Sequence, residues 1–170
     1  EKACRNFGGS FIEFTENAAL SLNPFTLVAD IDEDMELLQP LLAQMVSPRE
    51  PLDGFQYSTL GAAIKKVWKA RGNTMKVSDV HDLLATGRLD EDSRDEDRRL
   101  KDLAAMLHPY TREGVYGKYF ESDATIDFSS DFIVLELEEL KAKKDLQTVV
   151  LLIVMYRITR EMYFSRDRKK

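Results

Sequence analysis

The sequence predicts an α/β protein that is mainly helical, in which an incomplete α/β unit carries a helical insertion. Two short runs rich in β-favouring side chains lie near the two ends of the chain, at 10–14 and 132–138. About five segments with apolar residues at helical spacing account for most of the rest. The length of 170 residues fits one buried core, and 44% hydrophobic with 32% charged residues is typical of a soluble globular protein.

The first strand is expected at 10–14, because its aromatic and β-branched side chains favour extended backbone and follow the flexible pair Gly8-Gly9. A turn is expected at 21–24, since Pro24 fixes its own φ and disfavours helical backbone at Asn23.

A first helix is expected from about 32 to 45, where apolar residues recur every three or four positions. Asp32 or Asp34 can serve as its N-cap. Pro40 lies inside the pattern and is expected to kink or restart the helix.

A second helix is expected from Asp53 to about Arg71, because apolar residues recur there at helical intervals and Gly72 follows. A short third helix is expected to be capped by Ser78 and closed by Gly87.

The nearly all-charged stretch 90–101 is either a solvated loop or the exposed beginning of a helix that buries apolar residues up to Leu107. The segment 109–128 shows no sustained period and is expected to be an ordered loop. Its aromatic residues are expected to pack in the core rather than stack on nucleobases, because few basic residues lie among them. They are Tyr110, Tyr116, Tyr119, Phe120 and Phe128.

The continuous apolar run 132–135 favours a strand that is covered on both faces, as in parallel sheets. The long helix that follows, at 146–164, is apolar on almost every side in its first half, so we expect it to lie between the sheet and other helices. Strand and helix would form half of a right-handed crossover whose partner strand is missing.

Composition excludes several classes of function. The net charge of −6 opposes the phosphate neutralisation that drives nucleic-acid binding, which leaves only a minor alternative of DNA contact through the basic end at 166–170. One cysteine, Cys4, cannot form an internal disulfide, and with only His81 and His108 beside it a structural zinc site is not expected. The longest apolar run, 149–156, is far shorter than the roughly 20 residues that span a bilayer.

The segment from Gly114 to Lys118 invites comparison with a phosphate-binding loop, whose G-x-x-x-x-G-K-[ST] pattern surrounds phosphates with backbone N–H groups. The pattern fails twice. Arg112 stands where the first glycine belongs, and Tyr119 stands where a hydroxyl should hold magnesium. We therefore expect a turn packed by aromatic side chains.

Two pairs of charged residues are candidates for a role near a nucleotide. Glu136 and Glu138 follow the second strand, where a carboxylate can coordinate magnesium or activate water, and alternation places them on one face. The simpler interpretation is the polar end of a strand. Arg157 and Arg160 lie three apart on the last helix and could reach a phosphate across a subunit boundary, although salt bridges to nearby glutamates are the simpler role.

Over nearly its whole length the chain resembles the TraC-type ATPases of conjugative type IV secretion systems. Each matching segment is short, but their order and intervals together are specific. The segments are Gly8-Gly9-Ser10-Phe11-Ile12-Glu13-Phe14, Ser21-Leu22-Asn23-Pro24-Phe25, Leu41-Leu42-Ala43-Gln44-Met45, Tyr116-Gly117-Lys118-Tyr119-Phe120, and Phe132 through Lys141 running into Met155-Tyr156-Arg157.

The resemblance implies a partial RecA-like P-loop ATPase domain in which 1–30 and 129–170 belong to the nucleotide domain and 31–128 are a helical insertion and ordered loop. It places the phosphate loop before residue 1 and the acidic magnesium strand after residue 170. The chain also lacks an initiator methionine and a signal-peptide pattern, so we expect it to be part of a longer protein.

The resemblance further implies that the longer protein binds ATP and Mg²⁺, assembles with copies of itself and with other secretion-system components, and works at the cytoplasmic face of the inner membrane. It would energise pilus assembly and the transfer of DNA or protein. No catalytic or metal-binding residue maps onto this chain, so we expect the chain alone to bind no cofactor and to be inactive, because hydrolysis needs a phosphate cradle and a magnesium-bound carboxylate together. The alternative is a free-standing helical interaction module without ATPase activity.

Overall fold

The chain divides into two compact units. The prediction of a single core, which was based on the length of the chain, is therefore wrong. Unit 1 comprises 1–20 and 125–170, and unit 2 comprises 21–124. The computed structural model describes residues 4, 6, 8–15, 20–90, 95–126, 130 and 132–167, with side chains described as far as Arg160. The physical reason for two units is that the strands at the two ends of the chain pair with each other, while the helices between them bury one another.

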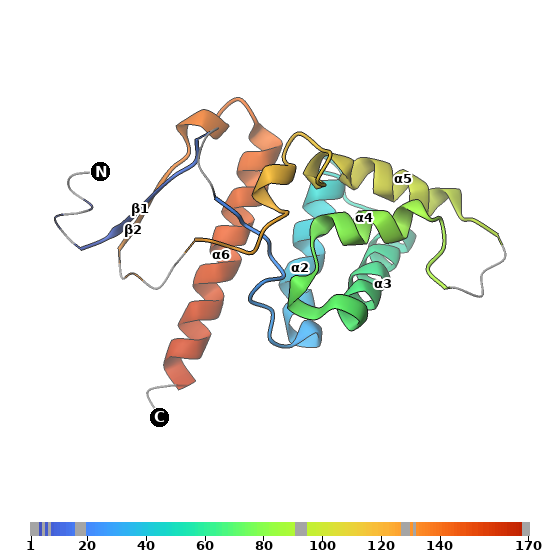
Figure 1. Ribbon diagram of the computed structural model, residues 1–170, viewed down its shortest axis with the longest axis horizontal. Coiled ribbons are helices and arrows are strands. Elements are labelled where there is room, and N and C mark those ends of the chain that lie inside the picture. Colours follow the sequence, from blue (N-terminus) through green and yellow to red (C-terminus); the bar gives the residue numbers. More distant parts are fainter. Residues whose placement is uncertain are drawn as a thin grey trace. The chain divides into compact units, whose positions relative to one another are not determined.

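Unit 1 contains a small parallel sheet (Figure 1). Strand β1, Ser10–Glu13, pairs in parallel with β2, Ile133–Glu136, so that the first and last residues of one strand face those of the other. Both predicted strands are confirmed in shortened form. At Gly9 a Cβ atom would lie 2.6 Å from the ring and from the carbonyl oxygen of Phe132, so only glycine allows this close approach.

Burial in β2 differs from the sequence expectation. Every residue of β2 is only half-buried. The prediction of a strand covered on both faces is therefore wrong for the described part of the chain, because two strands and one helix cannot enclose both faces of a parallel sheet.

The last helix, α6, runs over Lys144–Asp167, which confirms the prediction of a long helix at 146–164. It follows a short 3₁₀ turn, η4, at Glu138–Leu140. Over 144–160, where its side chains are described, one side of α6 is buried through residues that include Val149, Val150 and Ile153. The other side exposes a row of apolar residues described below.

In unit 2, the residues outside 91–94 form a helical core that contains four α-helices (Figure 1). They are α2, Ile31–Val46; α3, Gly54–Arg71; α4, Val77–Ala85; and α5, Arg98–Leu107. Their apolar faces meet in a core whose fully buried residues include Leu38, Leu42, Leu60, Ile64, Leu84 and Leu103. The periodicities that predicted these four helices are confirmed.

The N-terminus of α2 differs in detail from the prediction. Its cap is Asp30, whose carboxylate accepts hydrogen bonds from the backbone N–H groups of Asp32 and Glu33. Asp34 is instead buried and accepts from the backbone N–H of Ala29 at 3.3 Å. The helix continues as one element through Pro40, so the predicted restart does not occur.

The ends of α3 and α4 explain where these helices begin and stop. Asp53 and Gln56 form a reciprocal capping box at the start of α3, and Gly72 with φ +54° follows its end. Gly87, with φ +71°, closes α4 as predicted. The predicted cap Ser78 is wrong, because α4 begins one residue earlier and Ser78 is fully buried.

In the described part of the charged stretch, residues 95 and 96 are exposed and a helix then begins. Asp97 caps α5, and Arg99 in its first turn lies 3.6 Å over the ring of Phe55. This cation–π contact joins the beginning of α5 to the beginning of α3. Residues 91–94 lie outside the described part of the chain.

The predicted ordered loop is confirmed over its described residues. It contains the 3₁₀ turns η2, His108–Tyr110, and η3, Gly117–Tyr119. Tyr110, Tyr119 and Phe120 are buried, and the rings of Tyr110 and Phe120 meet edge to face at 5.6 Å. The aromatic residues therefore serve packing, while Phe128 lies outside the described residues.

Candidate functional site

The two candidate glutamates lie at the carboxyl end of β2 but do not share a face. Glu136 is the last residue of β2, and Glu138 begins the η4 turn, so strand alternation does not extend to it. One carboxylate oxygen of Glu136 accepts a hydrogen bond from the backbone N–H of Glu138 at 3.0 Å. The carboxylate of Glu138 pairs with Lys141 at 3.0 Å and is largely exposed. Both groups are thus engaged locally in the turn that leads to α6.

The two candidate arginines lie one turn apart on α6, as predicted, in different environments. Arg157 is only 4% exposed, whereas Arg160 is half-buried and donates a hydrogen bond to the hydroxyl of Tyr156 at 3.2 Å. At 1.5 Å rise per residue, Arg157 lies about 20 Å along the axis from the start of α6 at Lys144. The glutamates directly precede that start, so the two charged pairs do not form one cluster.

The segment from Gly114 to Lys118 is a packed turn, as expected. Three of its backbone N–H groups donate to carbonyl oxygens of the same loop: Gly114 donates to Thr111, Tyr116 to Pro109 and Gly117 to Gly114. A Cβ atom on Gly117 would lie 2.0 Å from the carbonyl oxygen of Thr111. A phosphate cradle needs N–H groups that point outward and are free, so this turn cannot provide one.

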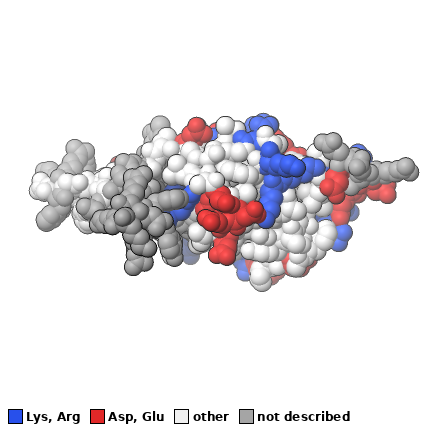
Figure 2. All heavy atoms as spheres, turned by 90° about the horizontal axis from the view of Figure 1, so that it is seen from below, with Lys and Arg blue, Asp and Glu red and all other residues white. Residues whose placement is uncertain are grey.

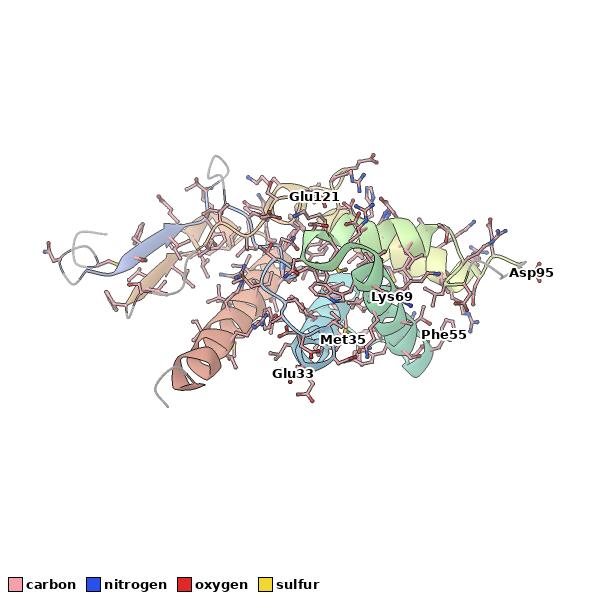
Figure 3. The ribbon with its side chains drawn as sticks, turned by 60° about the horizontal axis from the view of Figure 1, so that its bottom comes forward. Glu33, Met35, Phe55, Lys69, Asp95 and Glu121 are labelled. Carbon is pink, nitrogen blue, oxygen red and sulfur yellow. The ribbon has the colours of Figure 1, made fainter. Side chains whose placement is uncertain are left out.

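A polar cluster that the sequence did not indicate lies on α4 and the segments packed against it. We call it the α4 polar cluster and define it as Ser78, His81, Asp82, His108, Arg112 and Glu121. Its members come from α4, the end of α5 and the following loop, and Figure 3 shows Glu121 beside α4.

Hydrogen bonds link all members of the α4 polar cluster except His108, whose ring lies 5.7 Å from that of His81. The hydroxyl of Ser78 donates to Glu121 at 2.6 Å and accepts from the backbone N–H of Arg112 at 2.8 Å. The guanidinium of Arg112 donates to Asp82 at 3.0 Å, and the other carboxylate oxygen of Asp82 lies 3.0 Å from Nδ1 of His81. Apart from His81 and Asp82, which are neighbours in the chain, these contacts join residues 30 or more positions apart, which no spacing rule could have revealed.

Charged side chains form a mixed surface on α2 and α3. Figure 2 shows acidic side chains gathered beside a strip of basic ones. The first turn of α2 carries Asp32 and Glu33, the last turns of α3 carry Lys65 and Lys69, and Lys65 pairs with Asp32 at 2.5 Å. Such interspersed charges are typical of a solvated surface and do not form a continuous basic footprint for nucleic acid.

A pocket of about 360 Å³ lies between the second half of α2 and the segment that leads to α3. Its walls are mainly apolar or proline-rich, and Arg49 and Glu50 are its charged residues. The lining residues are Pro40, Ala43, Gln44, Ser47, Pro48, Arg49, Glu50, Pro51, Leu52 and Tyr57. This lining contains no histidine or cysteine and no nucleophile paired with a base, so it supplies no catalytic arrangement.

Two further properties hold for the described residues. They contain no group of three or more histidine, cysteine, aspartate or glutamate side chains placed to hold a metal ion. Among the same residues, none of the helices combines the length and the apolar character that crossing a bilayer requires.

Comparison with known proteins agrees with the resemblance seen in the sequence. Residues 1–170 match the family model described as the TraG P-loop domain. The chain is 31% identical over 172 residues to Protein TraC of Escherichia coli (strain K12), an alignment that covers 98% of this chain and 19% of that protein. The chain thus spans about a fifth of the length of this relative.

A solved structure shares the fold. The structure of VirB4 of Thermoanaerobacter pseudethanolicus superposes with a TM-score of 0.68 over 94% of this chain and 65% of that chain. At 17% identity this likeness concerns the fold. The match of residues 1–170 to the family model and the identity with TraC carry the assignment: the chain belongs to the TraG P-loop domain family.

Proposed function

We propose that this chain is an internal segment of a conjugative type IV secretion ATPase and is catalytically inactive by itself. In the proposal the phosphate loop precedes residue 1 and the acidic magnesium strand follows residue 170. Residues 1–30 and 129–170 belong to a RecA-like nucleotide domain, and 31–128 are its helical insertion. The longer protein uses ATP and Mg²⁺ to energise pilus assembly and the transfer of DNA or protein.

The observation that carries this proposal is the incomplete cover of unit 1. Parallel sheets occur almost only with both faces covered, and two strands are too few for a stable sheet. On α6, Leu151, Met155 and Ile158 are 42%, 64% and 41% exposed. Their spacing of four and three residues places them in one row on the helix. An open small sheet beside an apolar row is what we expect of one part of a larger α/β layer.

Two observations support inactivity of the chain alone. In the glycine-containing turn at 114–118, the N–H groups of Gly114, Tyr116 and Gly117 donate to carbonyl oxygens of the same loop and are not free for a triphosphate. Glu136 accepts a backbone hydrogen bond and Glu138 pairs with a lysine, so neither carboxylate is arranged for magnesium. Without a cradle and a metal-bound carboxylate, positioning and charge neutralisation are both missing.

In the longer protein we assign supporting roles to the four candidate residues. Glu136 and Glu138 lie where the strand ends, which is the edge at which α/β sheets bind ligands, so they would act near the nucleotide without holding it. Arg160, which is half-buried, would act at a boundary between subunits, and Arg157, which is 4% exposed, would support it from inside the fold. The partners in this proposal are other copies of the same protein and further secretion-system components, at the cytoplasmic face of the inner membrane.

The direct test compares ATP turnover by the 170-residue chain with turnover by a polypeptide extended on both sides to include the flanking coding sequence. We expect no turnover by the first and measurable turnover by the second. Turnover by the purified 170-residue chain, above that of a mock purification, would exclude the proposal. The flanking codons give an independent check, because they must encode a G-x-x-x-x-G-K-[ST] motif shortly before residue 1.

A second test addresses the apolar row on α6. Met155→Glu should barely change the stability of the 170-residue chain, since the side chain is 64% exposed there. In the extended protein the same change should lower the melting temperature strongly, because a charge would be buried. Met106→Glu is the matched control, being 38% exposed on α5. If Met155→Glu acts equally in both proteins, the row is not covered by the flanking protein.

The alternative function is a free-standing helical interaction module. It draws support from unit 2, which has a core of its own. The alternative requires a natural reading frame that ends near residue 170, so a frame that continues into an acidic strand would exclude it.

A further inference from the structure

The fold brings the two histidines of the chain together. His81 lies on α4, and His108 follows the last residue of α5 as its C-cap. Their ring centroids are 5.7 Å apart and the ring planes are inclined by 51°. We propose that His81 and His108 together bind a divalent transition-metal ion of the Zn²⁺ class, with water completing its coordination.

The separation of the two rings fits this proposal. Zinc binds imidazole nitrogen at about 2.1 Å and prefers tetrahedral coordination. Adding the distance from each nitrogen to its ring centre, two histidines on one tetrahedral ion have centroids about 5.3 Å apart. The observed 5.7 Å lies within reach of a small side-chain adjustment.

Asp82 prepares His81 for the role of a ligand. Its carboxylate lies 3.0 Å from Nδ1 of His81, an arrangement in which Nδ1–H donates to the carboxylate. That hydrogen bond leaves Nε2 of the neutral ring with the lone pair that a metal requires. A carboxylate behind a metal-binding histidine is the usual supporting group for zinc. Asp82 is held in turn by the guanidinium of Arg112 at 3.0 Å, so the carboxylate is a positioning group.

The surroundings of His108 also favour a cation. His108 lies at the carboxyl end of α5, which carries the negative end of the helix dipole. The side chain of His81 is 22% exposed and His108 is exposed, so an ion can enter from solvent. The described residues provide no third ligand, which leaves the remaining positions to water and makes the site exchangeable.

A bound ion would join α4 to the end of α5. Residues of α4 and of the end of α5 belong to the α4 polar cluster. An ion that binds only the folded state increases the free energy of unfolding as its site becomes occupied. This inference concerns unit 2 alone and does not depend on the ATPase proposal.

The first experiment is a titration of the 170-residue chain with Zn²⁺ by calorimetry, with Co²⁺ absorption as a second probe. We expect one ion per chain. His81→Ala and His108→Ala should each weaken binding at least about tenfold, and Asp82→Asn should weaken it about tenfold, which is the usual effect of losing a supporting carboxylate. Asp102→Asn, an exposed carboxylate on α5, is the matched control and should leave binding unchanged.

A second measurement needs no variant. Long-range ¹H–¹⁵N spectra of the unaltered chain should show Zn²⁺ shifting the Nε2 signal of His81 while Nδ1 stays protonated, with a shift at one nitrogen of His108. Absence of saturable binding, metal shifts at neither ring, or undiminished binding in the His81→Ala/His108→Ala double variant would each overturn the proposal. The last outcome would assign the ion to other groups, such as Cys4.

Discussion

The hydroxyl of Ser78 donates a 2.6 Å hydrogen bond to the carboxylate of Glu121, across a long stretch of chain. The same hydroxyl accepts the backbone N–H of Arg112. Ser78 is fully buried. Its hydroxyl therefore provides the hydrogen-bond partner for two groups of the loop after α5 and connects that loop to α4. A residue that looks like a helix cap in the sequence is thus a tertiary link.

Replacing Ser78 should destabilise unit 2. Ser78→Ala leaves the N–H of Arg112 and one carboxylate oxygen of Glu121 without their partner, and we expect a loss of about 2 kcal/mol in the free energy of unfolding. Ser58→Ala is the control, because Ser58 is exposed and bonds only to carbonyls of its own helix. Its loss should stay below about 0.5 kcal/mol in urea titrations. Equal losses of unfolding free energy in the two variants would show that the hydrogen bonds of Ser78 do not stabilise unit 2 more than a bond within one helix.

The cap of α2 can be located by mutation. Asp30→Ala removes the acceptor for two N–H groups of the first turn and should cost about 1 kcal/mol of unfolding free energy. Asp32→Ala removes only an exposed ion pair with Lys65 and should cost less than about 0.5 kcal/mol. Thermal unfolding of the two variants under the same conditions measures both losses. A larger loss in Asp32→Ala than in Asp30→Ala would identify Asp32 as the cap.

Close packing at Gly117 should forbid any larger residue. In Gly117→Ala the new Cβ would meet the carbonyl oxygen of Thr111 at 2.0 Å, so the backbone of the turn must move. We expect a loss of about 2 to 3 kcal/mol, as for other overpacked sites. Gly54→Ala meets nothing within 4 Å at the start of α3 and should be neutral or stabilising by about 0.5 kcal/mol. Chemical denaturation of both variants tests the contrast.

Asp97 should titrate at lower pH than an isolated aspartate. The side-chain hydrogen bond from Arg99 is the main cause that lowers its pKa, and the backbone N–H of Arg99 adds to it. A lowered folded-state pKa means that the contribution to stability is present above the unfolded-state pKa and is lost as pH falls through the folded-state value. Because the pair is exposed, added salt should weaken the effect.

Substitution of the arginine gives the test. Arg99→Gln should raise the pKa of Asp97 toward its ordinary value, without restoring it fully because the backbone N–H remains. Arg98→Gln, the exposed neighbour, should leave the pKa of Asp97 unchanged. Carbon-detected NMR titration of the carboxylate measures both variants, and an identical pKa in the Arg99 variant would contradict the assigned cause.

The sequence predicted much of the secondary structure, because apolar spacing and glycine positions are local properties. It predicted the helices of unit 2, the strands at both ends and the long last helix, and it rejected a phosphate loop at 114–118. It misplaced the caps of α2 and α4 by one or more residues. Several aspartates and a serine near a helix start are equally good caps by type, and only the path of the backbone selects one.

The environment of the four candidate residues was harder to predict from the sequence than the secondary structure was. Alternation would place Glu136 and Glu138 on one face, yet the strand ends at Glu136 and a turn begins. The one-turn spacing of Arg157 and Arg160 was correct, since it depends only on helical geometry. The near-complete burial of Arg157 could not be foreseen, because burial depends on what packs against α6.

By itself the sequence determined which segments are helices or strands, that 114–118 is not a phosphate loop, and membership of the TraG P-loop domain family, because these follow from local pattern and ordered motifs. Only the tertiary structure paired β1 with β2, divided the chain into two units, linked Ser78 to Glu121, and brought His81 to His108. Those contacts join residues far apart in the chain, and their formation depends on how buried faces fit one another in three dimensions.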